Sequence, residues 1–150
     1  MIARQRGGGF SLIEMIVVLA IIGILASVVT VNVVQYVGKA RREGTRLQLQ
    51  EIRTALTAFH VAHGFYPTTE QGLEALVRVP RGGPNLADYP RDGYLQGGVV
   101  PKDAWGNGIV YLSPGRKGES YEIISYGADG QPGGTGDDED IVIAEGAPSR

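Results

Sequence analysis

A segment near the carboxyl end of the chain has the residue types that could bind a hard cation. Residues 127–140, called the acidic loop below, contain five glycines and five acidic residues: Asp129, Asp137, Asp138, Glu139 and Asp140. Calcium takes roughly six to eight oxygen ligands from carboxylates, carbonyl groups and water, and glycine lets a backbone turn its carbonyl groups inward. Most acidic runs are solvated loops. The residues alone therefore leave a calcium site and a plain surface loop both open.

One carboxylate lies inside the longest apolar run of the chain. Glu14 is the only charged residue between Phe10 and Gly38. A charged side chain at the centre of a membrane helix costs roughly 2.5–3.5 kcal/mol on insertion scales. A carboxylate retained in such a segment is therefore expected to have a function and a positively charged partner.

The apolar run is long enough to cross a bilayer. Phe10–Val34 would form a helix of about 37 Å, which exceeds the ~30 Å hydrocarbon core. Arg4 and Arg6 precede the run, so the positive-inside rule places the N-terminus in the cytoplasm and residues from Lys39 onward outside. A secretory signal peptide has a shorter run and a small-residue cleavage site. A plain signal anchor explains neither Glu14 nor the three glycines before Phe10.

The apolar pattern predicts that the helix continues beyond the membrane segment to His63. Residues at helical spacing form one stripe: Leu49, Ile52, Leu56, Phe59 and His63. Gly64 can cap the helix, and Pro67 prevents its continuation. We expect the second half of this helix to pack on a sheet. His60 and His63 could form a metal pair, but no acidic residue completes such a site, so we expect both to pack structurally.

The remaining elements predict a small α+β domain. Thr68 and Gln71 form a capping box at the start of a short second helix. Residues 109–112 and 120–126 read as an antiparallel hairpin, and residues 140–144 as a third strand. The fold class is therefore a long N-terminal helix packed on a small antiparallel sheet. Trp105 is expected to anchor the core rather than to bind a ligand.

Composition excludes several classes of function. The chain has no cysteine, so disulfides, thiol catalysis and cysteine metal sites are excluded. A net charge of −2 gives no electrostatic footprint for nucleic acid. We find no nucleophile–base pair, phosphate loop or catalytic carboxylate pair, which favours a structural protein over an enzyme.

The string Gly9-Phe10-Ser11-Leu12-Ile13-Glu14 resembles the processing motif of type IV pilins and type II secretion pseudopilins. The resemblance implies that a prepilin peptidase cuts after Gly9 and methylates the amine of Phe10. It also implies that the apolar helix leaves the lipid to form a filament core. We expect Glu14 to pair with the new α-amine and to fix the register between neighbouring subunits. The chain has Val31 where many members have proline.

Two further strings resemble the major pseudopilin family of type II secretion: residues 66–76, YPTTEQGLEAL, and residues 103–108, DAWGNG. The acidic loop is similar to the calcium loop of that family. The resemblance implies a structural Ca²⁺ ion with Asp129, Asp137 and Asp138 as side-chain ligands. Backbone oxygens of Tyr126 and Thr135 are further expected ligands, and Asp140 is an alternative to Asp137 or Asp138.

The resemblance implies a non-enzymatic subunit with a leader (1–9), a transmembrane and filament-core helix (10–38) and a periplasmic globular domain (39–150). Its expected partners are copies of itself, minor pseudopilins, the prepilin peptidase, the inner-membrane assembly platform and, before assembly, membrane lipid. The periplasmic filament would drive proteins through the outer membrane. The alternatives are a type IV pilin subunit, or a membrane-anchored calcium-binding module that does not polymerise.

Overall fold

The structure is a computed structural model that describes residues 9–81, 83, 84, 86 and 88–146, and only the backbone of residues 28–35. The predicted leader lies outside the described residues, apart from Gly9. The chain divides into two compact units, one up to Gly38 and one from Lys39 onward. Each unit is described by itself.

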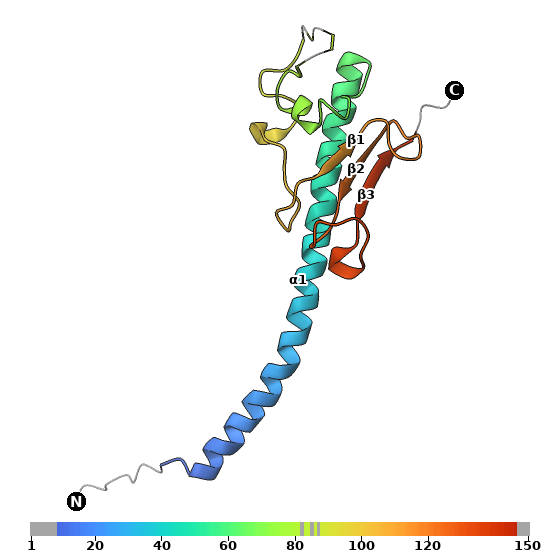
Figure 1. Ribbon diagram of the computed structural model, residues 1–150. Helices are drawn as coiled ribbons and strands as arrows, with labels where there is room; N and C mark the ends of the chain where they lie inside the picture. Colours follow the sequence, from blue (N-terminus) through green and yellow to red (C-terminus); the bar gives the residue numbers. More distant parts are fainter. Residues whose placement is uncertain (1–8, 82, 85, 87, 147–150) are drawn as a thin grey trace, which may run out of the picture. The chain divides into compact units, whose positions relative to one another are not determined.

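The N-terminal element is the long helix α1, Leu12–His63 (Figure 1). It begins two residues after the predicted start, because Ser11 caps it: the Glu14 amide donates to the Ser11 hydroxyl oxygen at 3.3 Å. It ends as predicted at His63, where the Gly64 amide donates to the His60 carbonyl at 2.7 Å. The single long helix is therefore confirmed.

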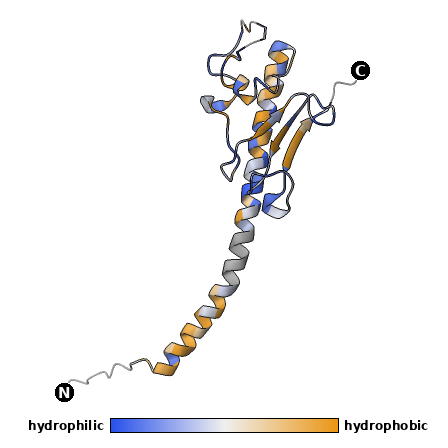
Figure 2. Cartoon of the chain, viewed as in Figure 1, coloured by the Kyte–Doolittle hydropathy of each residue, from blue (hydrophilic) through white to orange (hydrophobic). Residues whose placement is uncertain are grey.

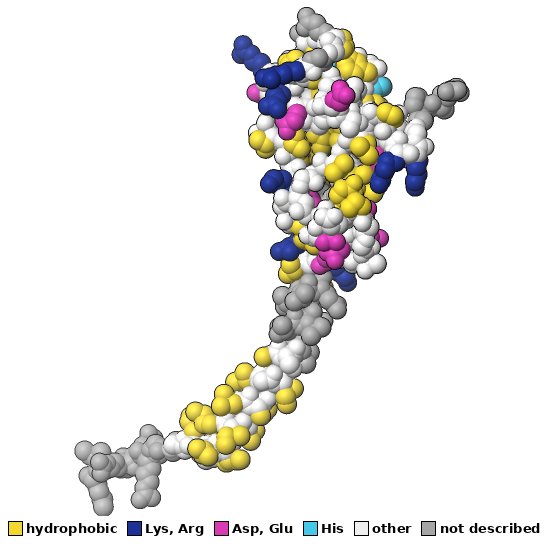
Figure 3. All heavy atoms as spheres, in the orientation of Figure 1, with side chains coloured by type: hydrophobic (Ala, Val, Ile, Leu, Met, Phe, Trp, Pro, Cys, Tyr) yellow, Lys and Arg dark blue, Asp and Glu magenta, His cyan; other side chains and the backbone are white. Residues whose placement is uncertain are grey.

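The first unit presents apolar side chains to every side of α1. Figure 2 shows that most residues in this part of the helix are hydrophobic, and Figure 3 shows their side chains on the face in view. Leu12 is 81% exposed, Leu19 68% and Ile24 67%. Successive residues on a helix are 100° apart, so the exposed run Met15–Leu19 surrounds the axis. Such a surface needs a cover that the isolated chain does not supply.

Among the described residues, no helix is both long enough and apolar enough to cross a membrane. Val31 belongs to the helical backbone of α1, but its side chain lies outside the described residues.

The second unit contains a three-stranded antiparallel sheet. Its strands are β1 (Val110–Leu112), β2 (Tyr121–Ser125) and β3 (Ile141–Glu145), in the order β1-β2-β3. Ile123 of β2 is opposite Tyr111 of β1 and Ile143 of β3. The predicted hairpin and third strand are confirmed, with boundaries shifted by about one residue, as is usual at element ends.

The core lies between the sheet and the second half of α1. The predicted stripe residues Leu49, Ile52, Leu56 and Phe59 are fully buried, and they meet Tyr121 and Ile123 of the central strand. Trp105 packs against the edge of this core, as predicted. Both faces of β2 are buried, so the central strand has little tolerance for a polar side chain without a partner.

The predicted second helix is shorter than expected. The capping box forms: the Gln71 amide donates to the Thr68 hydroxyl oxygen, and the Thr68 amide to the Gln71 side-chain oxygen. A turn follows, in which Gly72 has a φ of +62°. A residue at positive φ cannot continue a right-handed helix, so only the single 3₁₀ turn η1, Leu73–Leu76, remains. Two other 3₁₀ turns are η2, Gln96–Gly98, and η3, Gly136–Asp138.

Candidate functional site

The N-terminal motif lies at the start of α1 in an accessible arrangement. Gly9 and Phe10 precede the helix, and Phe10 is 76% exposed. Glu14 lies in the first helical turn, where the partial positive charge of the helix N-terminus favours a carboxylate. The peptide bond after Gly9 therefore lies outside regular structure, just before the helical turn that contains Glu14.

The acidic loop folds back tightly on itself after β2. The Ala128 amide donates to the Asp137 carbonyl at 2.9 Å. A Cβ at Gly127 would lie 2.7 Å from that carbonyl oxygen, and one at Gly134 would lie 2.5 Å from the Asp138 carbonyl oxygen. Both glycines also have positive φ, +66° and +83°. Only glycine satisfies both constraints without strain, so the compact loop depends on these two residues.

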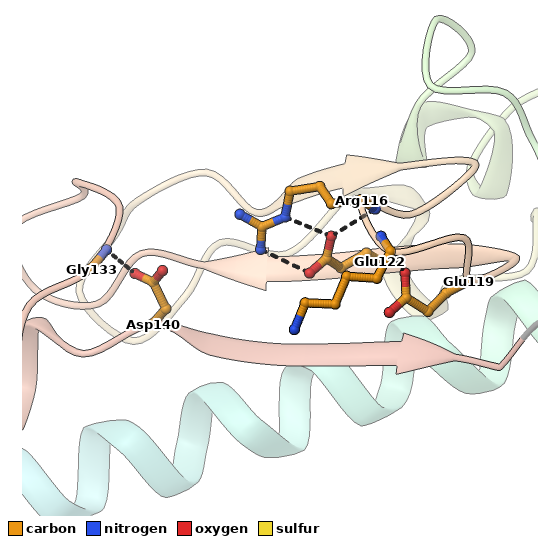
Figure 4. Close-up of polar contacts among 6 residues, drawn as sticks. Arg116, Glu119, Glu122, Gly133 and Asp140 are labelled. Atoms are coloured by element: carbon orange, nitrogen blue, oxygen red, sulfur yellow. Dashed lines mark hydrogen bonds and ion pairs between the residues drawn. The ribbon is translucent and has the colours of Figure 1, made fainter.

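The predicted ligand side chains have two kinds of environment. Asp129 accepts the Gln131 amide and Asp140 accepts the Gly133 amide, each at 2.9 Å. Figure 4 shows the contact between Gly133 and Asp140. The hydrogen bonds and ion pairs of the described residues include none to the carboxylates of Asp137 or Asp138. These two are the more available of the predicted side-chain ligands.

The predicted ligands do not meet at one point. Within the described part of the chain, no group of three or more histidine, cysteine or acidic side chains is placed to hold a metal ion. The Thr135 carbonyl accepts the Asp138 amide at 3.3 Å. The loop nevertheless provides carboxylate and carbonyl oxygens on a glycine-rich backbone, and this donor set fits calcium chemically.

Arg42 of α1 binds the acidic loop, a role that the sequence did not reveal. Its guanidinium donates to the Gly136 carbonyl and, at 3.4 Å, to the Glu139 carbonyl, and it forms a 2.8 Å ion pair with the Glu139 carboxylate. The loop is thus tied to the second half of α1 by a cation. No local pattern could have indicated this contact, because its partners are more than 90 residues apart.

Arg116 and Glu122 form a bidentate ion pair in the β1–β2 hairpin. Both terminal oxygens of Glu122 accept hydrogen bonds at 2.8 Å from the Arg116 guanidinium (Figure 4). The Glu122 side chain is 8% exposed, while that of Arg116 is 49% exposed. The hydrogen bond from Arg116 holds the pKa of the Glu122 carboxyl below its usual value.

This pair makes stability depend on pH. A carboxyl whose pKa is lower in the folded chain adds stability above its unfolded pKa, and this is lost as the pH falls through the folded pKa. Glu122→Gln should lower Tm near neutral pH, and the difference from wild type should shrink as the pH falls below the ordinary pKa of a glutamate carboxyl. Thermal unfolding followed by circular dichroism at a series of pH values measures it. Glu51→Gln, on the exposed side of α1, is the control, and an E122Q deficit that persists in acid would contradict the assignment.

Both histidines have packing partners. The His60 ring stacks on Tyr66 with centroids 4.3 Å apart. The Tyr94 hydroxyl lies 2.7 Å from the His63 Nε2 atom, and the His63 ring lies edge-on against Phe59 at 4.6 Å. These contacts fix the end of α1 in an aromatic cluster, which agrees with the structural role expected from the sequence.

Comparison with known proteins gives matches along most of the chain. Residues 32–144 match the family model described as Type II secretion system (T2SS), protein G, and residues 4–30 match the prokaryotic N-terminal methylation motif. A type II secretion system core protein G from Pseudomonas aeruginosa is 41% identical, covering 92% of this chain and 95% of the relative. One from Vibrio cholerae is 43% identical, covering 91% of each.

A solved structure shares the fold. It is the crystal structure of the major pseudopilin from the type 2 secretion system of enterohaemorrhagic Escherichia coli, with a TM-score of 0.57 and 38% identity. The match covers 69% of this chain and 86% of that one. Together with the matches along the sequence, it shows that the chain belongs to the protein G family of type II secretion systems, the major pseudopilins, which are structural subunits of the pseudopilus and not enzymes.

Proposed function

We propose that this subunit matures by cleavage after Gly9 and methylation of the new N-terminal amine on Phe10. The match of residues 4–30 to the N-terminal methylation motif supports the proposal. So does the exposure of Phe10 ahead of the first helical turn. A peptidase needs an accessible, non-helical segment at its cleavage site, and Gly9 lies in one.

The mature helix is then covered first by lipid and later by copies of itself. The observation that carries this step is the all-round exposure of apolar residues in the first unit. Lipid and a bundle of identical helices both remove such a surface from water. In this proposal the N-terminus lies in the cytoplasm and the second unit in the periplasm. The two positive charges before the apolar run, Arg4 and Arg6, support this orientation.

Glu14 determines how the copies fit together. Inside a helix bundle its carboxylate is costly unless a cation meets it. The freed amine of Phe10 on a neighbouring subunit supplies that cation. Because every subunit carries both groups, the same pair repeats along the filament and sets its axial register.

Assembly needs a machinery in the inner membrane. The prepilin peptidase matures the subunit, and an assembly platform moves it from lipid into the filament together with minor pseudopilins. The growing periplasmic filament drives proteins through the outer membrane. No pocket or catalytic group is required of the subunit itself, since the work is done by its polymer.

The acidic loop holds a structural calcium ion in this proposal. The carboxylates of Asp129, Asp137 and Asp138 hold it, with Asp140 as an alternative to Asp137 or Asp138. The carbonyl groups of Tyr126 and Thr135 complete the oxygen donor set. When bound, the ion supplies positive charge that neutralises the crowded carboxylates and joins β2 to β3.

Filament formation by the full chain tests the proposed function. The chain is produced with the prepilin peptidase and the assembly platform in cells that lack their own major pseudopilin. Electron microscopy of material released from the periplasm of these cells should show filaments that contain the chain. A chain that is processed and stable but never forms filaments would favour the anchored module that does not polymerise.

A further inference from the structure

Asn107 is followed by glycine, and this pair of residues can react within the chain itself. The side-chain amide carbon of an asparagine lies within reach of the next main-chain nitrogen, and glycine has no Cβ to block the approach. Gly108 is exposed, and a Cβ built there would meet no atom within 4 Å. The other two asparagines, Asn32 and Asn85, precede a valine and a leucine. Asn107 is therefore the asparagine whose neighbour leaves its nitrogen open.

The reaction is deamidation, which needs only water and makes asparagine a thermolabile residue. The Gly108 nitrogen attacks Cγ of Asn107: a C–N bond forms, the bond from Cγ to Nδ2 breaks, and ammonia leaves with the proton of the Gly108 amide. Water then opens the cyclic imide, and the imide nitrogen regains its proton from that water. Breaking the new bond gives aspartate. Breaking the original peptide bond gives isoaspartate, in which the main chain runs through Cγ.

The fold restrains both reacting groups. The side-chain amide of Asn107 donates to the Gly127 carbonyl at 2.8 Å, which fixes the group that is attacked. The Asn107 carbonyl shares a rigid peptide plane with the Gly108 nitrogen, and it accepts the Asp103 amide at 3.0 Å. The Asn107 amide in turn donates to Oδ1 of Asp103 at 2.7 Å. Ring closure requires rotation of the side chain and main chain of Asn107, so these hydrogen bonds must open first.

The turn that holds Asn107 is fixed to the core of the second unit. Asp103 is 5% exposed, and its Oδ2 atom accepts the hydroxyl of the fully buried Ser125 in β2 at 2.7 Å. The amide of Ala104 donates at 3.0 Å to the hydroxyl oxygen of Thr45, which is fully buried on α1. The turn is thus attached to both the sheet and the helix. Its hydrogen bonds are expected to open together with the packing of the domain.

Deamidation would damage the turn in which it occurs. Both products present an oxygen to the Gly127 carbonyl where the side chain of Asn107 donated a hydrogen bond, and both add a negative charge near the buried Asp103 carboxylate. Isoaspartate also lengthens the main chain within a turn that is closed by hydrogen bonds between Asp103 and Asn107. A deamidated chain should therefore refold to a less stable domain.

We infer that Asn107 and Gly108 form a deamidation site that the folded domain suppresses, so that a chain which has unfolded is altered permanently. The inference is independent of the proposed calcium site and of the proposed maturation. It assigns to the turn a second role besides packing: its hydrogen bonds protect the residue that supplies them. A subunit that unfolds for long would thereby lose the ability to return to the fully stable fold.

Peptide mapping of the full chain in detergent measures the reaction. Trypsin releases residues 103–116, and mass spectrometry distinguishes the amide from the acid in this peptide. During incubation at mildly alkaline pH, wild type in guanidinium chloride should convert Asn107 while Asn85 keeps its amide. The folded chain should convert Asn107 at least about tenfold more slowly, because several hydrogen bonds must open first. Equal rates at Asn107 in the folded and unfolded chain would overturn the inference.

Gly108→Ala tests the attacking nitrogen. Gly108 has no positive φ and open space around it, so alanine fits the fold, while its Cβ hinders ring closure. The variant should convert Asn107 more slowly than wild type in guanidinium chloride, and conversion at the wild-type rate would contradict the mechanism.

Asn107→Asp reproduces the aspartate product and tests the consequence. It should lower Tm, followed by circular dichroism, relative to wild type. Gln96→Glu is the matched control, because it makes the same change from amide to carboxyl at an exposed position, and its Tm should equal that of wild type. A wild-type Tm for Asn107→Asp, or an equal fall in Gln96→Glu, would overturn the inference that deamidation at this turn impairs the fold.

Discussion

Replacing Glu14 by alanine is expected to abolish filament assembly while leaving cleavage after Gly9 intact. Removing one partner of a buried ion pair typically costs about 3–5 kcal/mol, because the other charge stays buried alone. That corresponds to a loss of about two to four orders of magnitude in affinity between subunits. Filament yield by electron microscopy and the intact mass of the chain measure the two steps separately.

Two control variants identify the charge as the cause. Glu14→Gln keeps the shape and removes the charge, so it should fail like alanine. Ser27→Ala removes a polar group from the same helix, one that donates only to the Ile24 carbonyl of its own turn at 2.7 Å, and it should assemble normally. Wild-type filament yield from Glu14→Ala would show that the ion pair does not determine assembly.

Removing calcium is expected to lower the melting temperature of the second unit. An ion present at about 100 times its dissociation constant stabilises the folded chain by about 2.7 kcal/mol. For a domain of this size each 1 kcal/mol shifts Tm by about 4–8 °C, so the expected fall is roughly 10–20 °C. Thermal unfolding of the processed chain in detergent, with calcium or with excess EGTA, measures the difference.

Charge-matched variants separate a site from general electrostatics. Asp137→Asn combined with Asp138→Asn should lose most of the calcium-dependent shift in Tm. Asp88→Asn combined with Asp92→Asn removes the same charge from an exposed loop elsewhere and should keep the shift. An unchanged Tm on addition of EGTA to wild type would contradict the calcium proposal.

The fold was predictable where local patterns decide the structure. The stripe from Leu49 to His63 repeats at helical spacing; its first four residues are buried and His63 is half-buried. The strands follow from apolar runs bounded by turns, such as the five residues of β2. The length of the second helix was less predictable. The capping box at Thr68 predicted a helix, but the positive φ of Gly72 leaves only a single 3₁₀ turn.

The residue types of the acidic loop could be predicted from the sequence, but the residues that contact the loop could not. The types of residue in the acidic loop indicated oxygen ligands, and the two glycines that let its backbone close belong to that pattern. Arg42 and Asn107 were not identified, because they reach the loop from 94 and 20 residues away in the chain. Nothing in their own neighbourhoods distinguishes them from a surface arginine and a turn asparagine, so only the folded chain reveals their contacts.

The central claim is that the apolar half of α1 becomes a filament core once Phe10 carries the free N-terminus. The most direct measurement is the intact mass of the chain made in cells with and without the prepilin peptidase. With the peptidase, the chain should begin at Phe10 and carry one methyl group; without it, the chain should keep residues 1–9. A chain that still begins at Met1 in the presence of an active peptidase would contradict this account.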